Sequence, residues 1–259
     1  IAPLQGFHDG IRAVMHAADY GEITDRGVEN IRLPEPADLS ENSMSVDEAQ
    51  AKAMLRQAGV LTPEGVIWES NEVPDDIQYP VALKMCGRQI LHKTEIGGVK
   101  LNIATPVQLA DARQCMLHSA RQRGMEIERF LIEPMLRNSA GNLLVGVQQV
   151  PNMGMTLTIA FGGVATEMLH DSATLLLPAT RREIKAALRS LKMYPLLDGW
   201  RGRAKADTDA AIETILAICA YAEARRDTLL ELEINPLALL AEGQGTCALD
   251  AVMRFTEQE

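Results

Sequence analysis

The chain has 259 residues, the length of one large domain or of two smaller ones. Lysine and arginine number 25 and aspartate and glutamate 35, so the formal net charge is −10. Only 4% of the residues are aromatic. An acidic chain with few aromatic rings lacks the basic patches and stacking surfaces that nucleic acid requires, so nucleic-acid binding is excluded first. Phosphate ligands are not excluded, because a few local lysines and backbone N–H groups can hold them.

The cysteines and the apolar runs indicate the compartment. Cys86, Cys115, Cys219 and Cys247 form no CxxC pair, which is typical of a reducing cytoplasm. No apolar run approaches the roughly 18 residues of a membrane span, and no signal peptide is visible. We therefore expect a cytoplasmic protein without a membrane partner. Because the first residue is Ile1 rather than methionine, we also expect a piece of a longer polypeptide.

The N-terminal part is predicted to be a helix followed by a linker. Residues 1–24 place Ile11, Val14, Met15 and Ala18 on one helical face. Residues 25–44 carry two prolines among small polar residues, which is typical of a linker. Ser45-Val46-Asp47-Glu48 then has the pattern of a capping box, which predicts a helix that ends at Gly59. A domain therefore begins near residue 44.

Short strands and helices alternate along the rest of the chain. Strands are predicted at 65–68, 79–84, 98–103, 129–132, 142–149, 156–161, 229–240 and 246–254. Helices are predicted to start after Thr105 and Thr180, each within a capping-box pattern, and to span 207–224. The elements form two sets that meet near residue 130. This pattern indicates an α/β (α+β) fold with two lobes, at about 44–128 and 129–259.

The segment 81–101 is the first candidate site. An apolar strand is predicted to end in Lys84, and a lysine there is costly unless an anion neutralises it. The adjacent Gly97 and Gly98 let backbone N–H groups close on phosphate oxygens, and His92 and Lys93 precede them. The segment predicts phosphate binding. The alternative is a hairpin with a solvated lysine.

The end of the chain is the second candidate. If the hairpin turn lies near Gly243, antiparallel pairing sets Asn235 almost opposite Asp250. An amide oxygen and a carboxylate at this separation can share a magnesium ion, and Glu233 lies on the same face. The alternative is the ordinary polar face of a hairpin.

Two further segments give weaker signals. The strand at 129–132 breaks at Glu133, where an exposed backbone edge can pair with a flat heterocycle such as adenine beside Met135. A proline-terminated strand with a polar turn is the favoured alternative there. Glu167 and Asp171 lie one helical turn apart, where two carboxylates can assist a metal; a solvated helix face is the favoured alternative.

Taken together, these segments resemble the ATP-grasp domain of NDP-forming acyl-CoA synthetases, the ADP-forming acetate–CoA ligase family related to the succinyl-CoA synthetase beta subunit. The matching stretches are VALKMCGRQILHKTEIGGVKLNI, IEPM, LLVGVQQVPNMG, FGGVATEMLHD, YPLLDGWRG and ELEINPLAL, in the family's order and spacing. The resemblance implies a two-lobed ATP-grasp fold at 44–259. It also implies that residues 1–43 are the helical tail of a preceding CoA-ligase region plus a linker.

The resemblance further implies that a carboxylic acid, CoA and ATP give acyl-CoA, ADP and phosphate. By position, the ATP-binding residues would be Lys84, Lys93, Gly97, Gly98, Glu133 and Met135. Asn235 and Asp250 would hold Mg²⁺, with Glu233 near the transferred phosphate. His92 matches a histidine that relays phosphate in some members. An imidazole nitrogen is nucleophilic near neutral pH, and lysines and magnesium offset the charge of the transferring group.

The resemblance implies partners outside this chain, and it has departures. CoA and a small carboxylic acid would bind a CoA-binding or CoA-ligase domain or subunit, and family members form oligomers. This chain has Asn142 where the family has glutamate, Gln149-Val150 where it has an Arg-Asp pair, and Leu175 where it has arginine. These departures favour an alternative function. In it, a degenerate ATP-grasp module senses nucleotide or acyl-CoA in a fused protein lysine acetyltransferase.

Overall fold

The computed structural model describes residues 6–25, 43–70, 72–87, 93, 96–127, 129–162 and 171–256. The chain divides into two compact units, residues 1–35 and 36–259. The first unit contains helix α1 (Phe7–Asp25), which confirms the helix predicted near the N-terminus. The second unit contains the other described elements. Among the helices of the described ranges, none has the length and apolarity that crossing a membrane requires.

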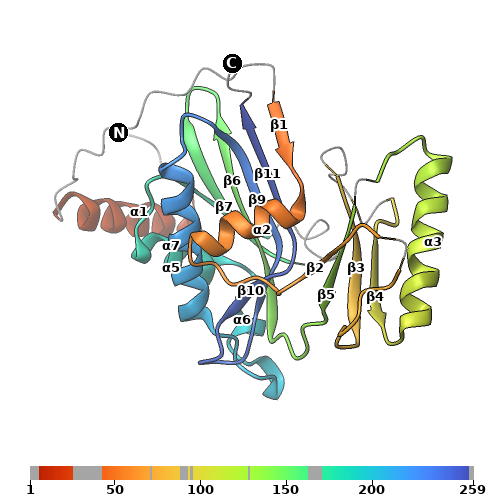
Figure 1. The fold of residues 1–259 in the computed structure, drawn as a ribbon. Coiled ribbons are helices and arrows are strands. Elements are labelled where there is room, and N and C mark those ends of the chain that lie inside the picture. The colour runs from red at the N-terminus through yellow and green to blue at the C-terminus, as the bar shows by residue number, and fades with distance from the viewer. Residues whose placement is uncertain are drawn as a thin grey trace. The chain divides into compact units, whose positions relative to one another are not determined.

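The second unit is built on two antiparallel sheets (Figure 1). The larger sheet contains β1 (Ser43–Val46), β6 (Gly141–Val150), β7 (Gly154–Phe161), β8 (Ser172–Leu176), β9 (Leu229–Leu239), β10 (Thr246–Ala248) and β11 (Ala251–Thr256). Its order is β1-β11-β9-β6-β7-β8, and β10 also pairs with β9. The smaller sheet contains β2 (Val66–Trp68), β3 (Val81–Cys86), β4 (Val99–Ile103) and β5 (Arg129–Pro134), in the order β2-β5-β3-β4.

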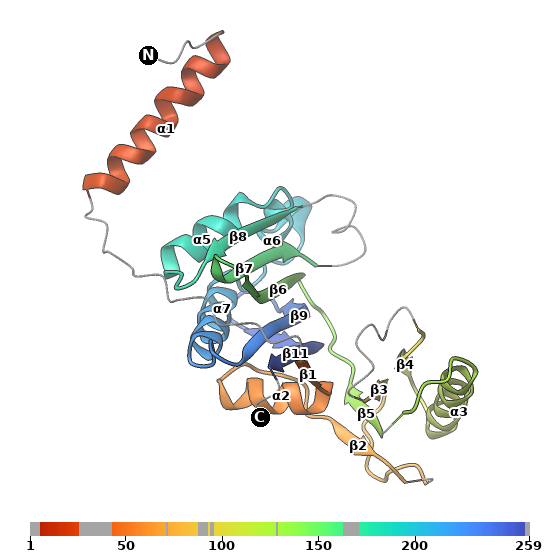
Figure 2. The ribbon, with the colours of Figure 1, turned by 90° about the horizontal axis from the view of Figure 1, so that it is seen from above.

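Helices cover both sheets. They are α2 (Glu48–Gln57), α3 (Pro106–Gln122), α5 (Arg181–Ser190), the short α6 (Tyr194–Leu197) and α7 (Thr208–Glu223), with one 3₁₀ turn at Trp200–Gly202. Figure 2 shows α3 along the smaller sheet, where Leu109 and Met116 are buried against Phe130. Helices α2, α5 and α7 bury their apolar faces in the core of the larger sheet. The chain therefore folds around two hydrophobic cores, one for each sheet.

Two of the three predicted capping patterns are confirmed. The Thr105 hydroxyl accepts the Gln108 N–H at 3.2 Å at the start of α3. Thr180 and Glu183 form a reciprocal capping box at the start of α5. In both helices a side-chain oxygen takes a backbone donor that the first turn leaves without a partner.

The first capping pattern was wrong. Ser45 lies in β1, opposite Arg254 of β11, so the chain is still extended at this position. The helix begins two residues later than the pattern implies, and its N-cap is Asp47, whose Oδ1 accepts the Gln50 N–H at 2.9 Å. The sheet pairing of β1 takes precedence over the local capping signal. Glu48 is the first residue of α2, and its side chain is not part of the helix cap.

The lobe boundaries predicted at 44–128 and 129–259 differ from the two sheets at both ends. β1 and α2 belong to the larger sheet, because β1 pairs with β11 and the Ala51 and Leu55 side chains lie in the larger core. β5 belongs to the smaller sheet, where β2 and β3 pair with its two edges. The predicted boundary at 128/129 therefore separates β5 from its own sheet. The edge strands β1 and β8 were not predicted.

Candidate functional site

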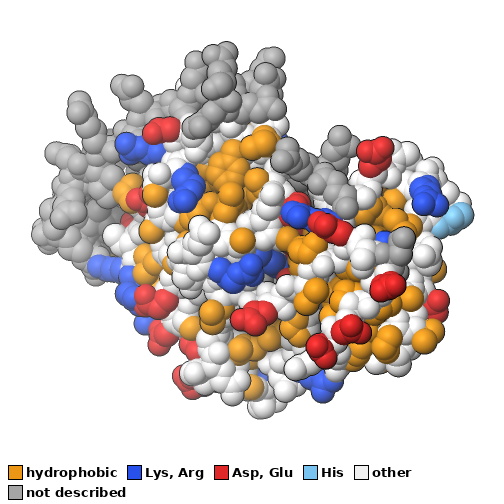
Figure 3. Space-filling model, in the orientation of Figure 1, with side chains coloured by type: hydrophobic (Ala, Val, Ile, Leu, Met, Phe, Trp, Pro, Cys, Tyr) orange, Lys and Arg blue, Asp and Glu red, His pale blue; other side chains and the backbone are white. Residues whose placement is uncertain are grey.

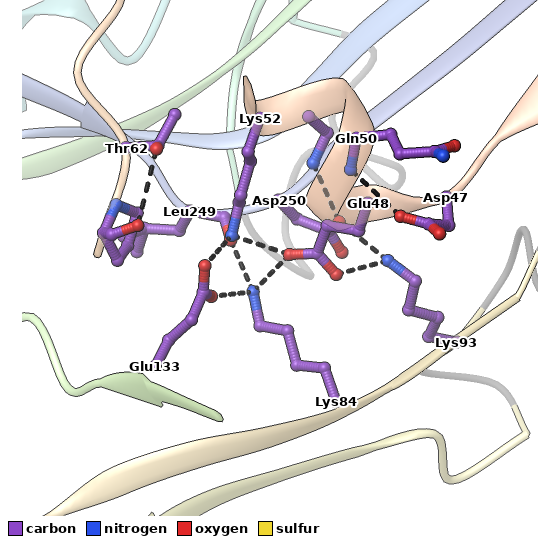
Figure 4. A network of polar contacts seen from close by, with 12 residues as sticks. Asp47, Glu48, Gln50, Lys52, Thr62, Lys84, Lys93, Glu133, Leu249 and Asp250 are labelled. Atoms are coloured by element: carbon purple, nitrogen blue, oxygen red, sulfur yellow. Dashed lines mark hydrogen bonds and ion pairs between the residues drawn. The ribbon is translucent and has the colours of Figure 1, made fainter. Parts of the chain in front are cut away.

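Six charged side chains meet between α2, the smaller sheet and the segment before β11 (Figure 4). We call this group the charged cluster; it consists of Glu48, Lys52, Lys84, Lys93, Glu133 and Asp250. All are deeply buried except Asp250, whose side chain is 26% exposed. Three ammonium groups and three carboxylates balance, as buried charges require.

Glu48 lies at the centre of the charged cluster. Its Oε1 lies 2.7 Å from Nζ of Lys84 and 2.7 Å from Nζ of Lys52, and its Oε2 accepts from Lys93. Burial alone would raise the pKa of Glu48, but the three ammonium groups outweigh it and hold the pKa far below its ordinary value. Glu48 is therefore a carboxylate shared by three lysines.

Lys84 uses all of its donors within the protein. Its Nζ donates to Glu48 Oε1 at 2.7 Å, to Glu133 Oε2 at 2.8 Å and to the Leu249 carbonyl at 2.5 Å. An ammonium group has three N–H donors, so this set is complete. The predicted strand end was misplaced, because β3 continues to Cys86 and Lys84 lies inside it. Burial lowers the pKa of Lys84, but Glu48 and Glu133 outweigh it and raise the pKa above its ordinary value.

Lys52 completes the charged cluster from α2. Its Nζ contacts Glu48 Oε1 at 2.7 Å, Glu133 Oε1 at 2.5 Å and the Leu249 carbonyl at 2.7 Å. Burial, together with the charge of Lys84, lowers the pKa of Lys52 despite its two carboxylate partners. The Leu249 carbonyl thus accepts from two ammonium groups. These bonds hold the backbone that leads into Asp250.

The predicted pairing of Asn235 with Asp250 is present. Ile234 of β9 stands opposite Ala251 of β11, and the Asn235 N–H donates to the Asp250 carbonyl at 3.2 Å. Asp250 Oδ1 lies 3.2 Å from Nζ of Lys93 and accepts the Ala251 N–H at 2.8 Å. Burial raises the pKa of Asp250. Glu233, two residues before Asn235 on β9, stands opposite Val252.

An amide and a carboxylate at this position fit magnesium by donor type. Within the ranges that the structure describes, no group of three or more His, Cys, Asp or Glu side chains forms a metal site. Magnesium commonly takes only one or two carboxylates from the protein and completes its shell with phosphate oxygens and water. Asn235 and Asp250 therefore suit a shared Mg²⁺ better than a closed structural metal.

The other predicted nucleotide contacts surround the same region. The Gly98 N–H donates to the Lys93 carbonyl at 2.6 Å, and a Cβ at Gly98 would lie 3.0 Å from that oxygen. A side chain at this position would crowd the Lys93 backbone, and glycine avoids that contact. The Met135 N–H donates to the Pro80 carbonyl at 3.1 Å, so an adenine at this link would use other backbone groups. His92 lies outside the described residues.

Glu48 and Lys52 were missed by the sequence analysis, which assigned Glu48 to a capping box. A signal was available. Positions 48, 51, 52 and 55 fall on one helical face, and Ala51 and Leu55 on that face are fully buried. Two opposite charges on the buried face of a helix require partners from elsewhere in the fold.

The departures from the family pattern lie in the larger sheet. Asn142 Oδ1 accepts the Ser139 hydroxyl at 2.9 Å. Gln149 is buried, and its Oε1 has no hydrogen-bond partner within the described ranges. Leu175 packs against the larger core. The charged cluster itself contains none of these positions.

The sequence comparisons give several matches. The profile of the ATP-grasp domain family matches residues 38–255. The beta subunit of the ADP-forming acetate–CoA ligase II of Pyrococcus furiosus is 30% identical over 219 residues, 82% of this chain and 92% of that protein. A trans-feruloyl-CoA synthase from an unknown prokaryotic organism is 30% identical over 250 residues, 93% of this chain. The chain spans only 35% of that synthase and 28% of the ADP-forming acetate–CoA ligase II of Archaeoglobus fulgidus.

Solved structures share the fold. A crystal structure of a Pyrococcus horikoshii Ot3 protein has a TM-score of 0.77 and 27% identity, over 83% of this chain and 93% of that chain. The dinucleotide-forming acetyl-coenzyme A synthetase 1 of Ca. Korarchaeum cryptofilum, in complex with coenzyme A and Ca-AMPCP, has a TM-score of 0.74 and 22% identity. The alignment covers 92% of this chain and 99% of that chain.

Proposed function

The chain belongs to the ATP-grasp domain family represented by the ADP-forming acetate–CoA ligases, and from this premise we propose that it is the ATP-binding, phosphoryl-transferring part of an ADP-forming acid–CoA ligase. The whole enzyme would convert a carboxylic acid, CoA and ATP into acyl-CoA, ADP and phosphate. The observation that carries the proposal is the charged cluster beside the Asn235–Asp250 pair. It combines buried ammonium groups with a magnesium-type donor pair in one place.

The proposed roles follow from the position of each side chain. Lys93 and Lys84 would bind phosphate oxygens, and the Gly97–Gly98 turn would let the backbone approach them. The Glu133–Met135 link would contact the adenine. Asn235 and Asp250 would hold Mg²⁺, which lowers the charge repulsion at the transferred phosphoryl group when bound. Glu233 would lie near that group.

We further propose that His92 accepts the phosphoryl group and relays it. A neutral imidazole nitrogen is a competent nucleophile near neutral pH, and the bond from the γ-phosphorus to ADP would break as the phosphorus–nitrogen bond forms. CoA and the acid would bind a CoA-ligase domain or subunit outside residues 44–259. Residues 1–43 would then be the helical tail and linker that lead from such a region, and we expect the assembled protein to be an oligomer.

A nucleotide or acyl-CoA sensor is the second candidate. The specific observation in its favour is Leu175, which packs against the larger core where the family has a cation for the phosphate region. A sensor would bind nucleotide without turnover, as expected of a module fused to a protein lysine acetyltransferase.

Peptide mass spectrometry after incubation with Mg·ATP, under alkaline conditions that preserve phosphohistidine, tests the relay. We expect a phosphoryl group on His92 that disappears in His92→Asn and in the presence of EDTA. His118→Asn is the matched control, because His118 lies on the exposed side of α3 and should leave the modification unchanged. Tight binding of Mg·ATP with no phosphorylation, even with a CoA-ligase partner added, would favour the sensor.

A further inference from the structure

The charged cluster is electrically neutral without any ligand. Lys52, Lys84 and Lys93 face Glu48, Glu133 and Asp250, each as an ion pair. A phosphate chain brings several negative charges and needs N–H donors that are free to turn toward it. The donors of Lys84 are all in use, so phosphate can gain one only if a protein acceptor gives way.

Glu48 is the acceptor that both phosphate-facing lysines share. Its Oε1 binds Lys84 at 2.7 Å and its Oε2 binds Lys93. Glu133, by contrast, pairs with Lys84 but with no atom of Lys93 among the contacts described, and Asp250 pairs with Lys93. A single carboxylate therefore occupies the two ammonium groups that the proposed function assigns to phosphate (Figure 4).

Glu48 also has a cation that stays with it. Lys52 lies one turn later on α2, and its Nζ is 2.7 Å from Glu48 Oε1. Both residues are carried by a helix that Ala51 and Leu55 anchor in the core of the larger sheet, whereas Lys84 is on the smaller sheet. If Lys84 and Lys93 turn toward phosphate, Lys52 still neutralises the carboxylate that they leave.

We propose that Glu48 is an internal counter-anion, which occupies Lys84 and Lys93 until the phosphates of the nucleotide displace it, and so sets the affinity of the site. This inference rests on the proposed function, because it takes the ligand to be a nucleoside triphosphate. The exchange moves no covalent bond. Lys84 and Lys93 replace carboxylate oxygens with phosphate oxygens, and Glu48 keeps Lys52. The affinity for the triphosphate is therefore reduced by the strength of the Glu48 contacts.

Isothermal titration calorimetry with Mg·ATP tests the inference through two variants of opposite charge. Glu48→Gln leaves the charged cluster with an excess positive charge, and we expect Mg·ATP to bind at least about fivefold more tightly than to the wild type, the lower end of typical coupling between sites. Lys52→Met leaves an excess negative charge, and Glu48 then has only Lys84 and Lys93 as partners. The affinity for Mg·ATP should therefore fall by a similar factor. The double variant should lie between them, near the wild type.

Asp47→Asn is the matched control. It makes the same charge change one residue away, it keeps a good N-cap, and Asp47 contacts Arg129 rather than the three lysines. We expect its affinity to stay within about twofold of the wild type, below the range of typical coupling. If Glu48→Gln binds Mg·ATP no more tightly than the wild type, or if Asp47→Asn tightens binding equally, the inference is overturned. If the wild type itself binds no Mg·ATP, the proposed function fails first and the inference with it.

Discussion

The Nζ atom of Lys84 lies 2.7 Å from Oε1 of Glu48 and joins two sheets that share no strand. Lys84 is on β3 of the smaller sheet, and Glu48 is on the helix that packs against the larger one. Asp47 extends the connection, because it caps the same helix and pairs with Arg129 of β5. The first turn of α2 is therefore an ionic link between the two cores.

Removal of Lys84 should destabilise the fold. We expect Lys84→Met to lower the free energy of unfolding by about 3–5 kcal/mol, because Glu48 and Glu133 lose a buried partner. Urea unfolding followed by circular dichroism measures the change. Lys205→Met is the control, since its pair with Asp198 is exposed to solvent and should contribute little to stability. A loss below about 1 kcal/mol for Lys84→Met would contradict the link between the sheets.

The pH dependence of stability should report Glu48. Its pKa is depressed in the folded state, so it binds protons less readily than in the unfolded chain and contributes stability above its ordinary value of 4.5. That contribution is lost progressively as the pH falls below 4.5. In chemical unfolding at a series of pH values, the stability difference between wild type and Glu48→Gln should narrow toward acid. A difference that stays constant would show that Glu48 does not retain its charge in the fold.

The proposed magnesium ligands Asn235 and Asp250 can be tested by comparing ATP binding in the presence and absence of Mg²⁺. Mg²⁺ should increase the affinity for ATP, and we expect Asp250→Asn to make this increase smaller by a factor of about ten or more. The reason is that a neutral amide replaces the charged ligand. Calorimetric titration of ATP with and without Mg²⁺ gives the ratio. Asp209→Asn, at an exposed position of α7, should leave this ratio unchanged. An unaltered ratio in Asp250→Asn would remove Asp250 from the metal site.

Gly65 lies where the backbone approaches β5 closely. A Cβ there would lie 2.6 Å from Leu131 Cδ1 and 3.0 Å from Glu133 Cγ. We expect Gly65→Ala to cost about 1–3 kcal/mol of unfolding free energy through overpacking. Gly146→Ala is the comparison within a strand, because its Cβ would meet only ordinary contacts at 3.8 Å and beyond. Equal thermal stability of the two variants would count against this close contact.

The elements with strong local signals were predictable. The pattern of apolar residues predicted most of the central strands. The capping patterns at Thr105 and Thr180 predicted the starts of α3 and α5. The edge strands β1 and β8 were not predicted, and β1 was missed because its four residues overlap the linker and capping-box patterns. The ATP-grasp assignment came from motif order rather than from any single residue.

The charged cluster was less accessible to sequence reasoning. The pairing of Asn235 with Asp250 was predicted because a short hairpin connects their strands and sets the register. The contacts of Lys52 join residues separated by as many as 197 positions, and no local pattern encodes such a separation. Only the presence of two charges on the buried face of α2 pointed to it. The surface charge does not mark the site either. On the face drawn in Figure 3, the described basic side chains form small groups among acidic and apolar ones.

The Leu249 carbonyl accepts from both Lys52 and Lys84, and this limits how far the domain can be truncated. A shortened chain that starts at β2 would keep every strand of the smaller sheet, and Lys84 and Glu133 with them. It would lose the segment from β1 through α2, and with it one of the two donors to Leu249 and the shared carboxylate of Glu48. The smallest fragment with an intact site therefore begins no later than Ser43, in a strand that pairs with the larger sheet and not with the sheet on which Lys84 stands.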